Sequence, residues 1–355
     1  MTLAYGVRRG GGVCARLEGR IVLLAALDPV FQAGSLNPFM ARGPEFWSET
    51  AARVRAGEGA EVQAGALALP FEVADYVDFY SSLHHAENLG RMFRPDAEPL
   101  LPNWRHLPVG YHGRSGTVVA SGAPVRRPRG QRRPPGAELP DFGPSTRLDI
   151  ELEAGFVIGV PSTLGEPVPL ERALDHVFGM VLVNDWSARD IQAWEYQPLG
   201  PFLGKSFATS VSSWVLPLAE LRDRIVPGER QEPPPLPYLR EEPWAFDVPL
   251  EVELNGTVVA RSNTRHLYWS AAQQIAHLTV NGASLRTGDL LATGTISGPS
   301  PESRGSLIEL SWNGSEPVEL RDGSTRTFLE DGDEVVLRGE PLGDVRGKVF
   351  RSDLF

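Results

Sequence analysis

Short strand-like segments recur along this 355-residue chain, and they constrain its fold more than any other feature. Each is rich in alternating or continuous apolar residues, and turn residues separate them, since the chain has 37 Gly and 31 Pro. The segments are GTVVAS (116–121), DIELEAGFVIGV (149–160), FGMVLVND (178–185), VPLEVELNGTVVAR (248–261, around an Asn255-Gly256 turn), SLIELSW (306–312) and DEVVLRG (333–339). This pattern predicts a β-rich domain with long ordered loops, where binding groups commonly lie.

The N-terminal part reads as a small unit of its own. VCARLEGRIVLL (13–24) alternates loosely around Glu18-Gly19, which predicts a hairpin, and PEFWSETAARVRA (44–56) has helical spacing. We therefore predict a small β-rich unit with one helix at residues 1–72.

Two helical patterns lie among the strands of the larger part, residues 73–355. They are ERALDHVF (171–178) and HLYWSAAQQIAHLTV (266–280). The second is followed by Asn281-Gly282, a helix C-cap signal. The larger part is therefore predicted to be β-rich α+β.

The charge balance disfavours two classes of partner. The chain has 34 Lys+Arg and 45 Asp+Glu, a formal net charge of −11, which repels nucleic acids and anionic membranes. Its arginine-rich segment VRRPRGQRRPP (125–135) has prolines and no interleaved aromatic residues, so we interpret it as a solvated extended loop. We expect no nucleic-acid partner and no membrane partner.

The single cysteine, Cys14, cannot form an internal disulfide or a thiolate metal cluster, which favours a reducing compartment. No apolar run approaches the roughly 20 residues that span a bilayer. The start MTLAYGVRRGGG lacks the apolar segment of a signal peptide. A cytoplasmic location is therefore expected.

Four acidic residues lie in unusually apolar or aromatic surroundings: Asp78, Glu151, Glu153 and Asp185. On a strand, Glu151 and Glu153 point to the same face, so their carboxylates crowd together unless a cation neutralises them. Oxygen ligands without cysteine favour Mg²⁺ or Ca²⁺ over zinc. A plainer interpretation also fits each acid alone: ELE as an exposed strand face, and Asp185 as a helix cap. Local spacing leaves both interpretations open.

Two adjacent histidines, His84 and His85, follow Asp78 in DFYSSLHHAENLG. A histidine near a metal site can act as a general base close to neutral pH. Either side chain could instead be packed or hydrogen-bonded in a helical turn, and local evidence does not choose between them.

A third candidate group lies in NDWSARDIQAWEYQPLGPFLGKSF (184–207), which contains Arg189, Gln192, Tyr196 and Lys205. Such donors can stabilise negative charge that develops on oxygen. The alternatives are that Arg189 pairs with a neighbouring acid such as Asp190 and that Lys205 lies on the surface.

Several long segments together resemble the fumarylacetoacetate hydrolase (fumarylacetoacetase) family. They are DYVDFYSSLHHAENLGRMFR, LPNWRHLPVGYHGR, NDWSARDIQAWEYQPLGPFLGKSF and GDLLATGTISGPSPESRGSLIELSW. The resemblance runs in order from about residue 70 to the C-terminus and is weaker before it. It implies a small SH3-like barrel at 1–72, a mixed β-sandwich roll at 73–355, and a homodimer.

The resemblance also implies roles for individual residues. Asp78, Glu151, Glu153 and Asp185 match metal ligands, and Asp185, Lys205 and Thr209 match a second Mg²⁺ site. His85, rather than His84, matches the general base, and Glu309 the acid that orients it. Arg189, Gln192 and Lys205 match charge-stabilising groups, and Tyr80, Arg94, Tyr111, Gln192, Tyr196 and Thr295 match substrate contacts, Arg94 being suited to a terminal carboxylate.

The implied reaction is hydrolysis of the carbon–carbon bond of 4-fumarylacetoacetate, a small β-diketo acid, to fumarate and acetoacetate. This is the last step of tyrosine and phenylalanine breakdown. The alternatives are a related acylpyruvate hydrolase, decarboxylase or isomerase, and a binding protein that has lost turnover. The long matched segments and the presence of His85, Glu309 and Lys205 favour the first reading.

Overall fold

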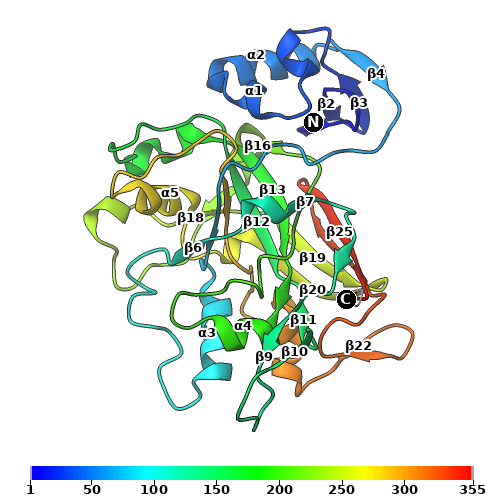
Figure 1. Ribbon diagram of the computed structural model, residues 1–355. Helices are drawn as coiled ribbons and strands as arrows, with labels where there is room; N and C mark the ends of the chain where they lie inside the picture. The colour runs from blue at the N-terminus through cyan, green and yellow to red at the C-terminus, as the bar shows by residue number, and fades with distance from the viewer. Residues whose placement is uncertain (1, 353–355) are drawn as a thin grey trace.

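The N-terminal unit of the chain is a four-stranded antiparallel sheet that carries two helices, as the computed structural model of residues 2–352 shows (Figure 1). Its elements are β1 (Leu3–Val7), β2 (Val13–Leu17), β3 (Arg20–Leu23), β4 (Ala60–Val62), α1 (Asn37–Met40) and α2 (Gly43–Arg55). Glu18 and Gly19 both have positive φ, 51° and 81°, the backbone of a tight hairpin turn. The predicted hairpin, helix and small β unit are confirmed.

This unit shares a hydrophobic core with the larger part. The backbone of Tyr5 in β1 exchanges two hydrogen bonds with Val215, of 2.9 and 2.8 Å. Phe39 and Trp47 contact the ring of Phe178 edge-on, with centroids 5.4 and 5.0 Å apart. The unit therefore covers one side of the main sheet, and a domain boundary at residue 72 stays a prediction.

The main sheet has eight strands in the order β6-β5-β21-β12-β13-β15-β7, with β16 paired to β13. The strands are β5 (Tyr76–Phe79), β6 (Gly110–His112), β7 (Val118–Ala120), β12 (Leu152–Ile158), β13 (Val177–Asp185), β15 (Thr209–Val211), β16 (Leu216–Pro217) and β21 (Leu290–Ala292). The pairs β21/β5 and β15/β7 are parallel and the others antiparallel, so the predicted mixed sheet is confirmed. Every residue of β12 and β13 is buried, which explains their continuous apolar runs.

A second mixed sheet has the order β20-β19-β24-β25-β8. Its strands are β8 (Val125–Arg126), β19 (Pro249–Leu254), β20 (Thr257–Asn263), β24 (Glu334–Gly339) and β25 (Gly343–Phe350). Four short pairs complete the strands: β9 (Arg129–Arg132) with β10 (Asp141–Pro144), β11 (Leu148–Asp149) with β14 (Ser187–Ala188), β17 (Ile225–Pro227) with β18 (Trp244–Phe246), and β22 (Val318–Glu319) with β23 (Thr325–Arg326). The predicted β19–β20 hairpin turns at Asn255-Gly256 and is confirmed.

The α-helices of the larger part are short and lie beside the sheets (Figure 1). They are α3 (Leu83–Phe93), α4 (Arg189–Glu195), α5 (Ala271–Thr279) and α6 (Leu307–Leu310). The predicted helix at 266–280 is confirmed with a later start, because Ser270 caps α5 through a capping box with Gln273. Gly282 follows it with φ 92°.

Three sequence predictions need correction. SLIELSW was expected to be a strand but contains α6, because the carboxylate of Asp149 accepts the backbone N–H groups of Leu307 and Ile308 and so caps a helix. ERALDHVF forms a 3₁₀-helix, Leu170–His176, and its last two residues begin β13. Its buried Ala173 lies three residues after Leu170, the repeat of a 3₁₀ turn.

The arginine-rich segment, expected to be a solvated loop, contains the short strands β8 and β9. Arg132 pairs with Asp141 across β9 and β10 at 2.9 Å, and Arg127 pairs with Asp331 at 2.6 Å. These two arginines are therefore partly neutralised by the protein itself.

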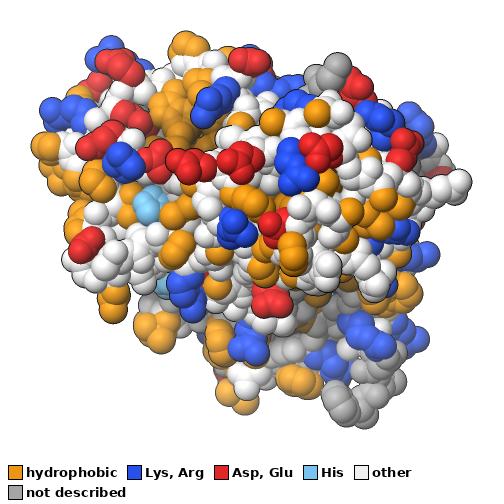
Figure 2. Space-filling view, turned by 90° about the horizontal axis from the view of Figure 1, so that it is seen from above, with side chains coloured by type: hydrophobic (Ala, Val, Ile, Leu, Met, Phe, Trp, Pro, Cys, Tyr) orange, Lys and Arg blue, Asp and Glu red, His pale blue; other side chains and the backbone are white. Residues whose placement is uncertain are grey.

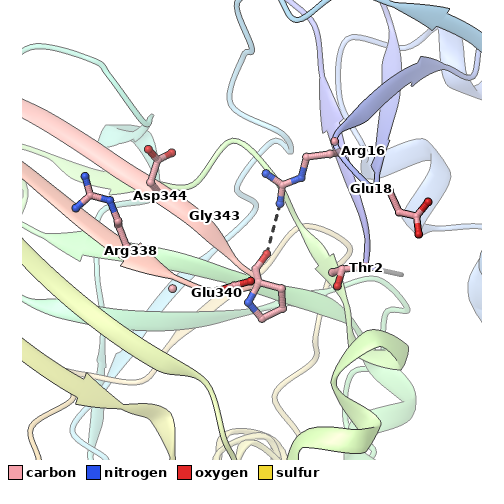
Figure 3. Close-up of a pocket in the computed structure, with 10 residues that line it drawn as sticks. Thr2, Arg16, Glu18, Arg338, Glu340, Gly343 and Asp344 are labelled. Carbon is pink, nitrogen blue, oxygen red and sulfur yellow. Dashed lines mark hydrogen bonds between the residues drawn. The ribbon is translucent and has the colours of Figure 1, made fainter.

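The face of the molecule on the side of the N-terminal unit mixes acidic, basic and apolar side chains (Figure 2). A cleft of about 570 Å³ lies where the N-terminal sheet meets β24 and β25, and there Arg16 donates to the backbone oxygen of Pro341 at 3.4 Å (Figure 3). None of its lining residues belongs to the predicted site.

Within residues 2–352, no helix is long and apolar enough to cross a membrane.

Candidate metal centre and active site

Four carboxylates meet in the interior of the larger part. Asp78 lies in β5, Glu151 directly before β12, Glu153 in β12, and Asp185 at the end of β13. One oxygen from each lies within 4.8 Å of the others, and all four residues are buried. Neighbouring strands of one sheet thus bring together the acids that the sequence singled out, here called the four-carboxylate cluster.

Two buried cations neutralise one side of this cluster. Lys205 Nζ lies 2.5 Å from Glu151 Oε2 and 2.9 Å from Asp185 Oδ2, and Arg189 Nη1 lies 2.8 Å from Glu151 Oε1. Burial alone would raise the pKa of Glu151, but the charges of Lys205 and Arg189 outweigh it and lower that pKa below its usual range. Thr209 also donates to Asp185, at 2.9 Å.

Three oxygens on the other side of the cluster form no hydrogen bond within residues 2–352. Neither oxygen of Glu153 nor Oδ1 of Asp78 has a hydrogen-bond partner among the described residues. Burial, and then the other carboxylates, raise the pKa values of both acids well above their ordinary range. If ionised, the four carboxylates exceed the two cations by two negative charges. Buried, unpaired carboxylate oxygens with this excess fit a hard divalent cation.

A second buried group lies beside the cluster. His85 is in the first turn of α3, where its backbone N–H donates to the capping hydroxyl of Ser82 at 3.3 Å. Its ring Nδ1 lies 2.7 Å from Glu309 Oε2. Because an ionised carboxylate only accepts hydrogen bonds, Nδ1 must carry the proton, and Nε2 is left as the basic nitrogen.

Glu309 is held as a carboxylate by several donors. Ser297 Oγ and Ser306 Oγ donate to its Oε2 at 2.9 and 2.7 Å, and Asn88 Nδ2 donates to Oε1 at 2.9 Å. Burial would raise its pKa, but His85, Asn88 and Ser306 lower that pKa to about 2. The pair is thus built to keep one tautomer of His85.

His84 points to a different part of the molecule. Its Nε2 lies 3.2 Å from Glu229 Oε1, and its ring lies edge-on to His266 with centroids 6.0 Å apart. Successive helical residues differ by about 100° around the axis, so the two adjacent histidines point in different directions. Of the two histidines, only His85 contacts Glu309, and His85 as the general base stays a prediction.

Arg189 is positioned by an acid that the sequence did not single out. Asp149 is buried, and its Oδ2 accepts from Arg189 Nε at 2.8 Å. The same carboxylate caps α6, which carries Glu309. Asp190, the neighbour considered as a partner for Arg189, instead accepts from Ser145 at 2.6 Å.

The structure places only some of the predicted substrate-contacting residues next to His85 and Arg189. The ring of Tyr80 lies edge-on to His85 at 5.3 Å, and Gln192 Oε1 accepts from Arg189 at 3.3 Å. Two predicted contacts have buried polar atoms without a hydrogen bond among residues 2–352, Arg94 Nε and Thr295 Oγ1, and Tyr111 lies opposite Asp78 in the β5–β6 pair. Tyr196 differs, since it is 49% exposed at the end of α4.

A cavity of about 250 Å³ adjoins the cluster. Tyr111 and Lys205 line it, together with residues of the segments 112–116 and 201–206. Lys205 connects this cavity to the cluster, because its ammonium group pairs with Glu151 and Asp185.

A family model described as fumarylacetoacetate (FAA) hydrolase C-terminal matches residues 75–350. This chain belongs to the fumarylacetoacetate hydrolase family. The matched range contains the four-carboxylate cluster, the His85–Glu309 pair, Arg189 and Lys205.

Curated members of the family are close in sequence. The fumarylacetoacetase of Rattus norvegicus is 50% identical over 346 residues, which cover 91% of this chain and 83% of the rat protein. That of Homo sapiens is 49% identical with the same coverage. A solved fumarylacetoacetate hydrolase from the psychrophile Exiguobacterium antarcticum has a TM-score of 0.64 at 19% identity, covering 99% of both chains, so it shares the fold.

Sequence reasoning missed four residues that contact Arg189 or Glu309, although two of them carried a signal. Asp149 continues the alternation of Glu151 and Glu153 on one strand face. Ser306 stands three residues before Glu309, the spacing of a helix-capping pair. Asn88 and Ser297 carried no comparable signal, because their contacts to Glu309 depend on the tertiary fold.

Proposed function

We propose that this protein hydrolyses the carbon–carbon bond of fumarylacetoacetate, which yields fumarate and acetoacetate. The observation that carries this proposal is about 50% identity to curated fumarylacetoacetases over about 90% of the chain. The buried His85–Glu309 pair beside the four-carboxylate cluster gives that identity a chemical basis. The place of this reaction at the end of tyrosine and phenylalanine breakdown is proposed on the same ground.

The first step is activation of water. His85 Nε2 accepts a proton from water because Glu309 keeps the hydrogen on Nδ1 and stabilises the imidazolium that forms. The water oxygen attacks the carbonyl carbon of the fumaryl group. Arg189 and Lys205 carry the positive charge that stabilises the resulting oxyanion, with Gln192 held against Arg189.

In the second step the bond to the neighbouring methylene carbon breaks. Its electron pair leaves as the enolate of acetoacetate, which the same cations stabilise, and a proton returned to that carbon completes the products. Tyr80, Arg94, Tyr111, Tyr196 and Thr295 are proposed to contact the substrate. The unpartnered, buried Nε of Arg94 supports its role as the group that binds a terminal carboxylate.

We propose that Asp78, Glu151, Glu153 and Asp185 hold Mg²⁺ or Ca²⁺, since their donor set is all oxygen. When bound, such an ion supplies Lewis-acid polarisation of the diketone oxygens. A second Mg²⁺ near Asp185, Lys205 and Thr209 stays a prediction. The contacts of Lys205 and Thr209 to Asp185 support only their proximity.

A cytoplasmic homodimer is proposed as the working form. Large apolar side chains are exposed in one segment after α4: Leu199 at 95%, Phe202 at 68% and Leu203 at 49%. Such residues commonly mark an interface, which supports self-association. The net charge of −11 supports the expectation that neither nucleic acid nor a membrane is a partner.

The proposal is tested by incubating the purified, Mg²⁺-supplied protein with fumarylacetoacetate. Loss of the diketone absorbance should accompany equal amounts of fumarate and acetoacetate. A protein that binds the substrate without forming either product would be the non-catalytic alternative. Preference for an acylpyruvate would indicate the related hydrolases.

A further inference from the structure

A second group of metal-ligand side chains includes His84, which directly precedes His85 in α3. It consists of His84, Glu229 and His266, each offering one ligand atom, and these atoms lie within 4.8 Å of one another. None of the three belongs to the four-carboxylate cluster, and none is used in the proposed reaction.

The three residues come from separate segments. His84 is in the first turn of α3, Glu229 lies in the loop after β17, and His266 ends a 3₁₀ turn after β20. Because these segments are distant in sequence, only the fold brings their ligand atoms together. A metal ion that binds them would therefore stabilise the folded state.

The spacing suits a small transition ion. Two ligands at about 2.0–2.1 Å from a tetrahedral Zn²⁺ lie roughly 3.3 Å apart. His84 Nε2 and Glu229 Oε1 are 3.2 Å apart. All three residues are half-buried, so side-chain rotation can bring the third ligand closer without moving the core.

The ring nitrogens of His266 are available to bind a metal ion. Among residues 2–352 its ring nitrogens form no hydrogen bond, although the ring is half-buried beside His84. Gly298 leaves room for the ring, since a Cβ there would lie 2.9 Å from Cδ2 of His266.

We propose that His84, Glu229 and His266 form a second metal site, for a borderline divalent transition ion such as Zn²⁺. Two imidazoles and one carboxylate favour such an ion over Mg²⁺ or Ca²⁺, whereas the all-oxygen four-carboxylate cluster has the opposite preference. Bound metal would fasten the first turn of α3, which also carries His85, to the two neighbouring segments. Water completes the coordination on the exposed side.

The test is a Zn²⁺ titration of the metal-stripped full chain in excess Mg²⁺, which keeps the four-carboxylate cluster supplied. Wild type should bind one equivalent of Zn²⁺. The variants His84→Gln and His266→Gln should bind it at least about 10- to 100-fold more weakly, because even the loss of an outer-shell partner has that effect. When Co²⁺ replaces Zn²⁺, the visible absorption bands that arise from imidazole ligation should disappear in both variants.

The matched control is His112→Gln. His112 also pairs with a carboxylate, Asp75, at 3.0 Å, but it belongs to no three-ligand group among the described residues. Its Zn²⁺ binding should equal that of wild type. Circular dichroism of each variant establishes that it is folded.

Two results would overturn the proposal. One is a folded wild-type protein that binds no Zn²⁺, or binds it equally well after His84→Gln and His266→Gln. The other is loss of the Zn²⁺ equivalent in Glu153→Gln, which would place the ion in the four-carboxylate cluster instead.

Discussion

Replacing Glu309 with glutamine removes one charge from the catalytic pair while keeping its shape. In the native site Oε2 accepts from His85, Ser297 and Ser306, and Oε1 accepts from Asn88. An amide has one oxygen and one NH₂ group, so one of these two positions becomes a donor. Either orientation breaks part of the network.

The orientation with NH₂ toward His85 has the larger consequence. Nδ1 must then accept, the proton moves to Nε2, and the nitrogen that should take a proton from water is already protonated. In the other orientation the imidazolium loses its neighbouring negative charge. We expect kcat to fall by about 10² to 10⁴, the usual contribution of a positioned general base, with metal content unchanged.

The assay is the initial rate of diketone loss at saturating substrate, with metal content measured on the same sample. Glu302→Gln is the matched control, because Glu302 lies seven residues earlier and is exposed. It should retain wild-type turnover. A folded Glu309→Gln enzyme with kcat within a few-fold of wild type would refute the assignment of Glu309 as the orienting acid.

Three further predictions concern the metal, Asp149 and Asp289. Chelation should abolish activity and Mg²⁺ or Ca²⁺ should restore it; full turnover by demonstrably metal-free protein would contradict the assignment of the four-carboxylate cluster. Asp149→Asn should lower kcat by up to about 10² to 10³, the cost of losing one charge-stabilising donor, because Arg189 loses one of its two charged partners and keeps only Glu151. Asp190→Asn should spare kcat, and equal rates for the two variants would show that Asp149 does not position Arg189. Burial raises the pKa of Asp289 from 3.8 to about 6, so the folded state keeps this proton at a pH where the unfolded state has lost it. As the pH rises between these values, the unfolding free energy of wild type should therefore fall by at most about 3 kcal/mol relative to that of Asp289→Asn. The same pH dependence of the unfolding free energy in both proteins, measured by chemical denaturation, would contradict this.

The strands and the acids of the four-carboxylate cluster were largely predictable because their signals are local. Alternation in one strand places Glu151 and Glu153 on one face, and the apolar run of β13 delivers Asp185 to the same place. Both patterns depend on a few consecutive residues, and the sheet preserves them.

The supporting contacts were not predictable in the same way. SLIELSW has the apolar content of a strand, but Asp149, more than 150 residues earlier, caps it as a helix. The choice between His84 and His85 likewise depends on where Glu309 and Glu229 lie after folding. Local sequence could therefore name candidates, whereas their partners required either the fold or the family resemblance.

The most direct test of the whole account is product formation from fumarylacetoacetate by three metal-supplied proteins: wild type, His85→Ala and His84→Ala. Wild type and His84→Ala should release fumarate and acetoacetate in equal amounts at similar rates. His85→Ala should be slower by about 10² to 10⁴ while retaining its Mg²⁺ or Ca²⁺. An active His85→Ala enzyme beside an inactive His84→Ala enzyme, or no cleavage by wild type, would contradict the central claim.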